Sequence, residues 1–153
     1  EKLVTLTKSE HKKPEREYRR LESAYEKADE RAKEVKNRIA RVDQIAHDLF
    51  KEWSEEIKSM SSKNLKKQSE KSLSESRERY KGLHESLKRS ERKMDPVLSK
   101  MRDHTLFAKH NLNAKALTGL KKEAADIQGD IDVLLGDIQK SIKDAEEFIK
   151  KLE

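Results

Sequence analysis

Five histidines are the residues of this chain with the most obvious capacity for chemistry, because imidazole binds metals and transfers protons near neutral pH. A zinc site needs three or four converging ligands, commonly including a pair three or four residues apart on a helix. No two of these histidines have that spacing, and the sequence contains no cysteine. We therefore expect no metal site, no thiolate chemistry and no disulfide. The histidines are His11, His47, His84, His104 and His110.

Carboxylates are abundant, and neighbouring pairs such as Asp29–Glu30 and Glu55–Glu56 occur throughout the chain. General acid–base catalysis needs a carboxylate held in a shaped, partly desolvated cleft. In a sequence with 43% charged residues, adjacent carboxylates do not indicate such a cleft. The glycines are dispersed and form no phosphate-binding loop. We expect no catalytic residue, no cofactor and no enzymatic activity.

Positive charge is concentrated in the middle of the sequence. The chain has a formal net charge of +6, and residues 63–93 contain 11 Lys or Arg against 5 Asp or Glu. If Leu73 occupies an inward a position of a heptad, six of these basic residues occupy outward b, c and f positions. They are Lys67, Lys71, Lys81, Lys88, Arg89 and Arg92.

This basic face is the strongest candidate for a binding surface in the sequence. One interpretation is that this helix face is only solvated and that neighbouring Asp and Glu residues compensate its positive charge. The other is a surface for an anionic membrane or an acidic envelope polymer, or for the phosphates of a nucleic acid. Tyr80 is the only aromatic residue among the basic ones, and no nucleic-acid-binding motif is present. The pattern favours a membrane or an acidic polymer over nucleic acid.

Long helices must position these residues. Only 33% of the residues are hydrophobic, which is too few for a compact globule of 153 residues. From Tyr18 to Trp53, however, apolar residues recur with alternating spacings of three and four, which indicates a coiled-coil-type seam. Two similar seams run over residues 73–108 and 117–152.

These seams predict an all-α fold, an elongated antiparallel three-helix bundle with helices at about residues 14–60, 66–110 and 114–152. Pro14 suits the first helical turn, so we expect residues 1–13 to be an extended or frayed lead-in. Residues 14–153 are expected to form a single domain. Pro96 lies inside the second seam, which keeps its register there, so we expect a kink rather than a break.

The connection between the second and third helices contains two asparagines. Asn113 precedes Ala-Lys-Ala and is a plausible N-cap, whose side-chain oxygen accepts a free helix N–H. Asn111 can close the second helix in the left-handed conformation. The segment is therefore interpreted as a corner of the bundle rather than a site.

Three segments resemble a known bacterial family, the domain of unknown function 2959. They are RIARVDQIAHDLFKEW (38–53), ERKMDPVLSKMRD (91–103) and LFAKHNLNAKAL (106–117). Members of that family look like envelope proteins, often with a signal or lipoprotein sequence ahead of a helical region. The resemblance therefore implies a periplasmic or envelope-associated protein, and it supplies no catalytic residue. No signal peptide and no transmembrane segment is visible in this sequence.

Three functions remain open at this point. The favoured one is a non-enzymatic structural or interaction scaffold of the bacterial cell envelope, which acts through helix–helix association and forms a homodimer. The second is a BAR-like dimeric module that binds an anionic membrane surface through the basic face of the second helix. The third is a nucleic-acid-associated coiled-coil protein.

Overall fold

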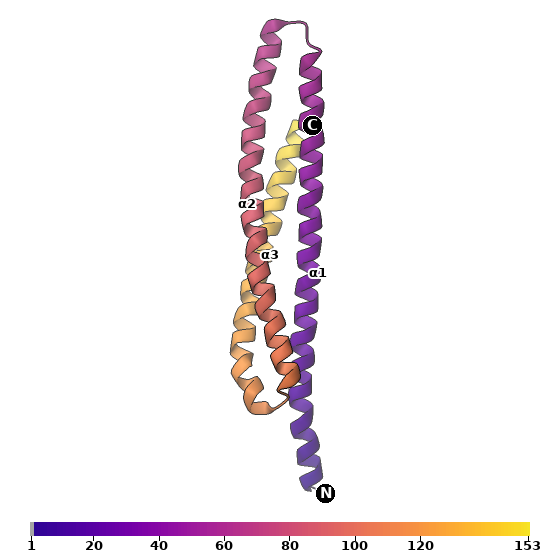
Figure 1. The fold of residues 1–153 in the computed structure, drawn as a ribbon, viewed down its shortest axis with the longest axis vertical. Coiled ribbons are helices and arrows are strands. Elements are labelled where there is room, and N and C mark those ends of the chain that lie inside the picture. Colours follow the sequence, from indigo (N-terminus) through magenta and orange to yellow (C-terminus); the bar gives the residue numbers. More distant parts are fainter. Residues whose placement is uncertain (1) are drawn as a thin grey trace. The chain divides into compact units, whose positions relative to one another are not determined.

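Three α-helices make up the computed structural model, in which the backbone of residues 2–153 and the side chains of residues 13–113 and 115–153 are described. They are α1 (Lys2–Lys58), α2 (Lys63–His110) and α3 (Ala114–Leu152) (Figure 1). The described chain contains no strand. The fold is therefore the predicted all-α three-helix bundle. Glu1 and the side chain of His11 lie outside the described residues.

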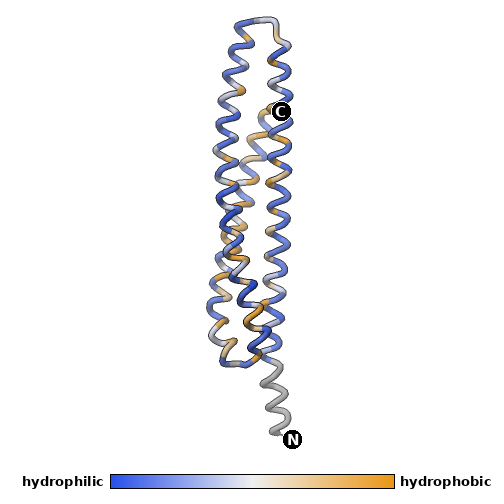
Figure 2. Tube along the Cα trace, viewed as in Figure 1, coloured by the Kyte–Doolittle hydropathy of each residue, from blue (hydrophilic) through white to orange (hydrophobic). Residues whose placement is uncertain are grey.

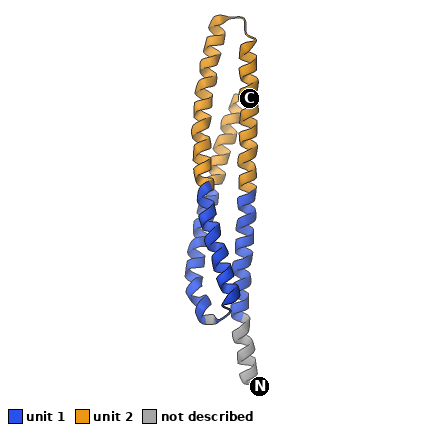
Figure 3. Cartoon of the chain, in the orientation of Figure 1, with its two compact units in different colours: residues 1–33, 92–136 blue, residues 34–91, 137–153 orange. Residues whose placement is uncertain are grey.

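Two compact units divide the bundle, and each contains a segment of all three helices (Figure 3). Unit 1 comprises residues 1–33 and 92–136, and it includes the corner between α2 and α3. Unit 2 comprises residues 34–91 and 137–153, and it includes the turn between α1 and α2. The prediction of a single domain over residues 14–153 stays a prediction, which the unfolding experiment in the Discussion addresses.

The start of α1 differs from the prediction. The helix begins at Lys2, and Pro14 lies inside it rather than in its first turn. The expected extended lead-in over residues 1–13 is therefore wrong for residues 2–13. A proline removes one backbone hydrogen bond, but it does not by itself prevent a helix that is already formed on its C-terminal side from continuing. Pro96 is likewise inside α2, which continues through it as predicted.

The apolar seam of α1 is buried where the sequence places it. Figure 2 shows apolar positions recurring among polar ones along each helix. In α1, the fully or nearly fully buried residues that follow the predicted spacing are Ala28, Ala32, Val35, Ile39, Val42 and Ala46. Burial of these small and β-branched side chains on a narrow stripe allows the helices to approach closely.

The seams of α2 and α3 are wider than predicted and shift by one residue in places. After Met94, α2 buries Leu98 where the strict spacing predicted Val97, and it buries Thr105, one of the two predicted alternatives, rather than His104. The Thr105 hydroxyl donates to the Met101 carbonyl at 2.9 Å, which satisfies this polar group inside the core. A helix with 3.6 residues per turn drifts away from a strict 3.5-residue repeat, and a core with three helices covers a broader face.

Likewise, α3 buries Leu135, Ile142 and Ile149 completely or nearly so. Their predicted neighbours Leu134, Ser141 and Phe148 are only partly buried. The shift places Ile142 rather than Ser141 in the core of unit 2.

The α1–α2 turn covers residues 59–62. The Ser62 hydroxyl oxygen accepts the Leu65 N–H at 3.3 Å and so caps α2 at its start. The Ser59 hydroxyl donates to the Glu56 carbonyl at 2.7 Å and satisfies the end of α1. Serine side chains therefore close both helices at this turn.

Candidate interaction surfaces

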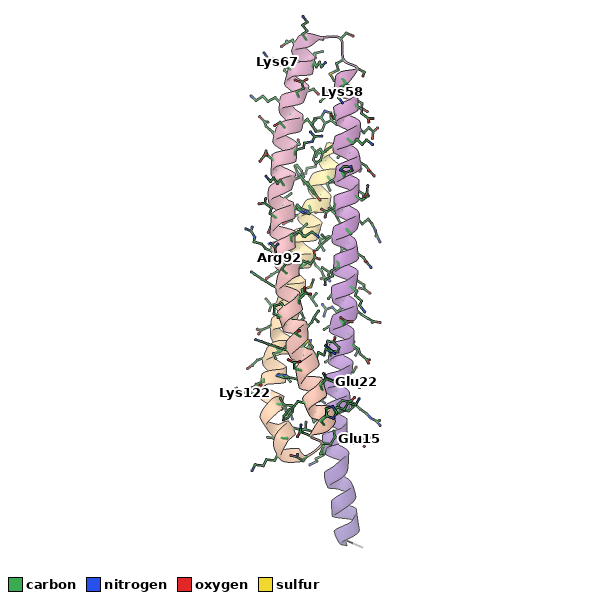
Figure 4. All side chains as sticks on the ribbon, viewed as in Figure 1. Glu15, Glu22, Lys58, Lys67, Arg92 and Lys122 are labelled. Atoms are coloured by element: carbon green, nitrogen blue, oxygen red, sulfur yellow. The ribbon has the colours of Figure 1, made fainter. Side chains whose placement is uncertain are left out.

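The predicted basic face lies on α2, and most of it belongs to unit 2. Lys67, Lys71, Lys81 and Arg89 are exposed there, and Lys88 is partly exposed. Arg92 is also exposed but belongs to unit 1. Lys67 and Arg92 are labelled on α2 in Figure 4.

Acidic neighbours compensate only one member of this face among the described residues. Lys88 Nζ lies 3.4 Å from Glu91 Oε2, an ion pair one helical turn apart. Glu91 Oε2 is buried, and it accepts no hydrogen bond from the described residues. Within the described part of the chain, Lys67, Lys71, Lys81 and Arg89 form no ion pair. Among these residues, a direct ion pair within the described chain is therefore formed by Lys88 alone.

A groove of about 600 Å³ lies between α1 and α3 of unit 2. Its apolar floor consists of Ile45, Leu49 and Trp53 from α1 with Leu152 from α3. The three α1 residues are four apart, so they lie along one face of that helix. Trp53 ends the predicted seam of α1 and was expected in the core, but it is only partly buried and lines this groove.

Carboxylates form the rim of the same groove. Asp48, Glu52 and Glu56 follow one another at intervals of four residues on α1, and Glu153 completes the rim. No Lys or Arg lines it. Asp48 accepts a hydrogen bond from Gln44 at 3.0 Å, whereas no ion pair is formed by Glu52 or Glu56 within the described chain. The groove thus combines an apolar floor with uncompensated negative charge, and we call it the acidic groove.

Two further hollows border α3 in unit 2, one on its α2 side and one farther along its α1 side. On the α2 side, the Arg79 guanidinium lies 5.2 Å from the centre of the Phe148 ring, a cation–π contact that covers the aromatic face. Farther along the α1 side, Arg38 pairs with Glu146 at 3.1 Å across the two helices. The acidic groove lacks such a covering contact.

A polar cluster links α1 and α2 in unit 2. Asp43 Oδ1 lies 2.7 Å from His84 Nδ1, and it also accepts a hydrogen bond from the Tyr80 hydroxyl. The Tyr80 ring packs against Phe50 at 6.0 Å between ring centres. Burial raises the pKa of Tyr80, and the hydrogen bond to Asp43 and its negative charge raise it further. The cluster holds Tyr80 in its neutral, hydrogen-bonded form.

The two asparagines of the α2–α3 corner cap its helices, one of them differently from the prediction. The Asn113 side-chain oxygen accepts the Ala116 N–H at 2.8 Å, which is the expected N-cap. Asn111 is not in the left-handed conformation, because no described non-glycine residue has a positive φ. Its side-chain amide instead donates to the Phe107 carbonyl at 3.0 Å. A side chain thus satisfies the orphan carbonyl that a left-handed backbone was expected to satisfy.

Sequence reasoning found the basic face and the corner but missed the acidic groove and the Asp43 cluster. The spacing of Asp48, Glu52 and Glu56 beside an apolar row was a usable signal for the groove. The cluster had a weaker signal, because Tyr80 occupies a seam position where a hydroxyl requires a partner.

The described side chains include no group of three potential ligands that could hold a metal ion. None of the described helices is long and apolar enough to cross a membrane.

Comparison with protein families identifies one match. The family with the description "Protein of unknown function (DUF2959)" matches residues 1–152. The chain belongs to this family. The match confirms the resemblance that was inferred from the segments around Trp53, Pro96 and Asn111, and it extends over nearly the whole chain. The same comparisons find no matching curated protein and no matching solved structure.

Proposed function

We propose that this chain is a non-enzymatic helical scaffold of the bacterial cell envelope and that it acts by binding a helix of a second copy in the acidic groove. The observation that carries this proposal is the groove itself. Ile45, Leu49 and Trp53 line the groove as an apolar row beside three carboxylates, with Ile45 exposed and the other two partly buried. Apolar residues at intervals of four on one helix face are the usual docking surface for another helix.

Charge complementarity favours a second copy as the occupant. The row Asp48, Glu52 and Glu56 has its counterpart on the same chain, where Lys67 and Lys71 are also four residues apart and exposed. At a rise of 1.5 Å per residue, both spacings correspond to about 6 Å along a helix axis. The α2 helix of one copy therefore matches the acidic groove of the other in the sign and the spacing of its charges.

Symmetry makes such an arrangement self-limiting. If α2 of each copy contacts the groove of the other, the same two surfaces are used twice and the assembly closes as a homodimer. Opposite charges across the contact favour this register over alternatives with like charges side by side. An antiparallel homodimer is the oligomer we propose.

The envelope localisation rests on the family resemblance. Members of the family look like envelope proteins, and the basic composition of this chain is compatible with that environment. A scaffold function is supported by long helices whose described surfaces form docking grooves rather than an enclosed, partly desolvated cleft with acid–base groups.

Sedimentation equilibrium over a range of protein concentrations tests this proposal. The chain has a mass of 17.9 kDa, and we expect the mass of the native protein to rise toward twice this value. The variant Ile45→Glu should weaken association, since Ile45 is 42% exposed and its replacement adds a like charge to the groove. The matched control Val133→Glu changes an exposed valine of α3 in unit 1 and should leave association unchanged. A native mass of 17.9 kDa at every concentration would exclude the dimer.

A second candidate function is binding of an anionic membrane surface through the basic face of α2. It is favoured by the absence of compensating ion pairs at Lys67, Lys71, Lys81 and Arg89 among the described residues. Each basic residue near an anionic lipid surface contributes about 1 kcal/mol. Vesicle binding that is lost in Lys81→Glu/Arg89→Glu would support this function, and unchanged binding would exclude it.

A further inference from the structure

The corner between α2 and α3 exposes three large apolar side chains in unit 1. The exposed fractions are 40% for Leu106, 45% for Phe107 and 47% for Leu112. Elsewhere on the described surface, exposed large apolar residues are isolated or belong to the acidic groove or the α1–α2 turn. A group of such residues at one corner of a unit indicates an interaction surface, because exposed large apolar residues ordinarily occur singly.

The same corner carries only positive charge. No Asp or Glu occurs between His104 and Lys122, a segment that contains four lysines. All four are exposed, and Lys122 is labelled beside the corner in Figure 4. They are Lys109, Lys115, Lys121 and Lys122. Lys109 lies between Phe107 and Leu112 in the sequence, and Lys115 follows Leu112 by three residues.

Two carboxylates of α1 at this end of unit 1 contact side chains of α1 itself. Glu15 and Glu22 are labelled at the same level as the corner in Figure 4. Glu15 pairs with Arg19 at 3.3 Å, and Glu22 accepts a hydrogen bond from Tyr18 at 2.5 Å. The nearest carboxylate after the corner on α3, Glu123, lies 3.5 Å from His104 Nε2. Among the described residues, none of the four lysines of the corner forms an ion pair.

We propose that the α2–α3 corner inserts into the surface of an anionic lipid bilayer. In this arrangement, Phe107 and Leu112 enter the boundary between headgroups and acyl chains. The lysine ammonium groups contact lipid phosphates, while their aliphatic stems lie along the apolar surface. The proposal does not depend on the acidic groove, which belongs to unit 2.

The directions of the apolar side chains favour a bilayer over a groove on a protein. Leu106 and Phe107 are consecutive on a helix, so they leave it about 100° apart. Leu112 follows after the helix has ended. A single narrow groove on a protein accommodates side chains that are three or four residues apart on one helix face. It does not accommodate side chains that point in different directions from a corner. A fluid lipid surface adapts to the shape of the α2–α3 corner and contacts all three residues.

Co-sedimentation with vesicles tests the proposal. We expect the chain to bind vesicles of phosphatidylglycerol and phosphatidylethanolamine at low salt, and to bind pure phosphatidylcholine vesicles much more weakly. Phe107→Ser/Leu112→Ser keeps every charge but removes the inserting side chains, so the partition coefficient should fall about tenfold or more. The matched control Val133→Ser, at a valine that is 66% exposed on α3 of the same unit, should bind as the native chain does.

A site-specific fluorophore reports insertion directly. Because the sequence contains no cysteine, Leu112→Cys provides a single labelling site. An environment-sensitive dye at this position should shift to shorter wavelength when anionic vesicles are added, and brominated lipid should quench it. The same dye at Val133→Cys should change little.

Three outcomes would overturn the proposal. They are no binding to anionic vesicles, equal dye responses at the two labelled positions, and full binding by Phe107→Ser/Leu112→Ser. Loss of binding in Lys81→Glu/Arg89→Glu together with full binding by the corner variant would assign the membrane contact to the basic face of α2 instead. Sedimentation equilibrium without vesicles provides a further check, because a change of oligomeric mass in the corner variant would indicate a protein contact at this corner and exclude the lipid assignment.

Discussion

Asp43 Oδ1 lies 2.7 Å from His84 Nδ1 and thereby joins α1 to α2 in unit 2. The same oxygen accepts the hydroxyl proton of Tyr80, one helical turn before His84. One carboxylate thus satisfies two polar side chains that would otherwise lie partly buried without partners. Because hydrogen bonds specify which helix faces meet, this cluster sets the register of α1 against α2 in unit 2.

Replacement of Asp43 is expected to destabilise the chain. Asp43→Ala leaves the Tyr80 hydroxyl and the His84 ring without their partner, so the free energy of unfolding should fall by about 1–2 kcal/mol. Asp29→Ala provides the control, since its ion pair with Lys33 lies at the surface, where solvent screens it, and should contribute much less. Urea unfolding followed by circular dichroism measures both. Equal effects in the two variants would show that the cluster contributes no more than a surface pair.

Stability should also depend on pH through Tyr80. The pKa of Tyr80 is raised in the folded chain above its ordinary value of 10.0 by burial and by Asp43. Above pH 10 the unfolded chain therefore releases this proton while the folded chain retains it. By linkage, the stabilisation is complete below pH 10 and is lost as the pH rises further.

Native chain and Tyr80→Phe are compared in urea at pH 8 and at a pH above 10. The difference between their free energies of unfolding should shrink at the higher pH, because the native chain loses stability that the phenylalanine variant does not lose. Other tyrosines and lysines titrate in both proteins and cancel in the comparison. A difference that is independent of pH would contradict the role given to Tyr80.

The Asn113 cap gives a prediction about the α2–α3 corner. Asn113→Ala removes the acceptor for the Ala116 N–H and should cost about 1 kcal/mol, whereas Asn113→Asp should retain most of the stability. Asn37→Ala is the matched control, because Asn37 is exposed in the middle of α1 and alanine is the better helix former there. If Asn113→Ala were as stable as Asn37→Ala, the cap would have no energetic role.

Replacement of glycines inside α3 by alanine is expected to stabilise the folded chain. A Cβ at Gly129 or Gly136 would meet no atom within 4 Å, so alanine fits without strain. Each replacement should raise the free energy of unfolding by up to about 1 kcal/mol, because alanine restricts the unfolded chain. Thermal unfolding at one protein concentration measures this. A decrease instead would show that another copy of the chain approaches the helix closely at that glycine.

The single-domain prediction can be tested with Trp53, the only tryptophan, which lies in unit 2. Ile131 is completely buried in unit 1, and Ile131→Ala should cost about 2–5 kcal/mol. If residues 14–153 unfold as one domain, this variant shifts the Trp53 fluorescence transition and the circular dichroism transition equally. A fluorescence transition that stays at its native midpoint would show that unit 2 unfolds independently of unit 1.

Several of these features follow directly from the sequence. The spacing from Ala28 to Ala46 predicts the buried stripe of α1, and Asn113 predicts its cap, because both depend on interactions within one helix or across one turn. The seam shift to Leu98 and Ile142 does not follow, since it depends on how broad a face the two other helices cover. The left-handed conformation expected at Asn111 was wrong because its side chain reaches the Phe107 carbonyl first.

The acidic groove is another feature that does not follow from the sequence alone. Its carboxylates and apolar residues are visible in the sequence, but their separation from compensating lysines is a property of the packed helices. The sequence predicted Trp53 as core because the seam continues through it. In the structure, α3 covers this residue only in part, which leaves it at the floor of the groove.

The most direct test of helix–helix association is a charge exchange between the groove and the basic face. Glu52→Lys/Glu56→Lys and Lys67→Glu/Lys71→Glu are each compared with the native chain by sedimentation equilibrium. Each pair of changes alone should weaken the dimer, since it places like charges side by side. An equimolar mixture of the two variants should form a heterodimer, which has one native-like contact and one contact with the charges exchanged. The combined variant should recover a large part of the native association, because opposite charges face each other again. Failure of the combined variant to associate more tightly than either single exchange would contradict the proposal that the acidic groove binds α2 of a second copy.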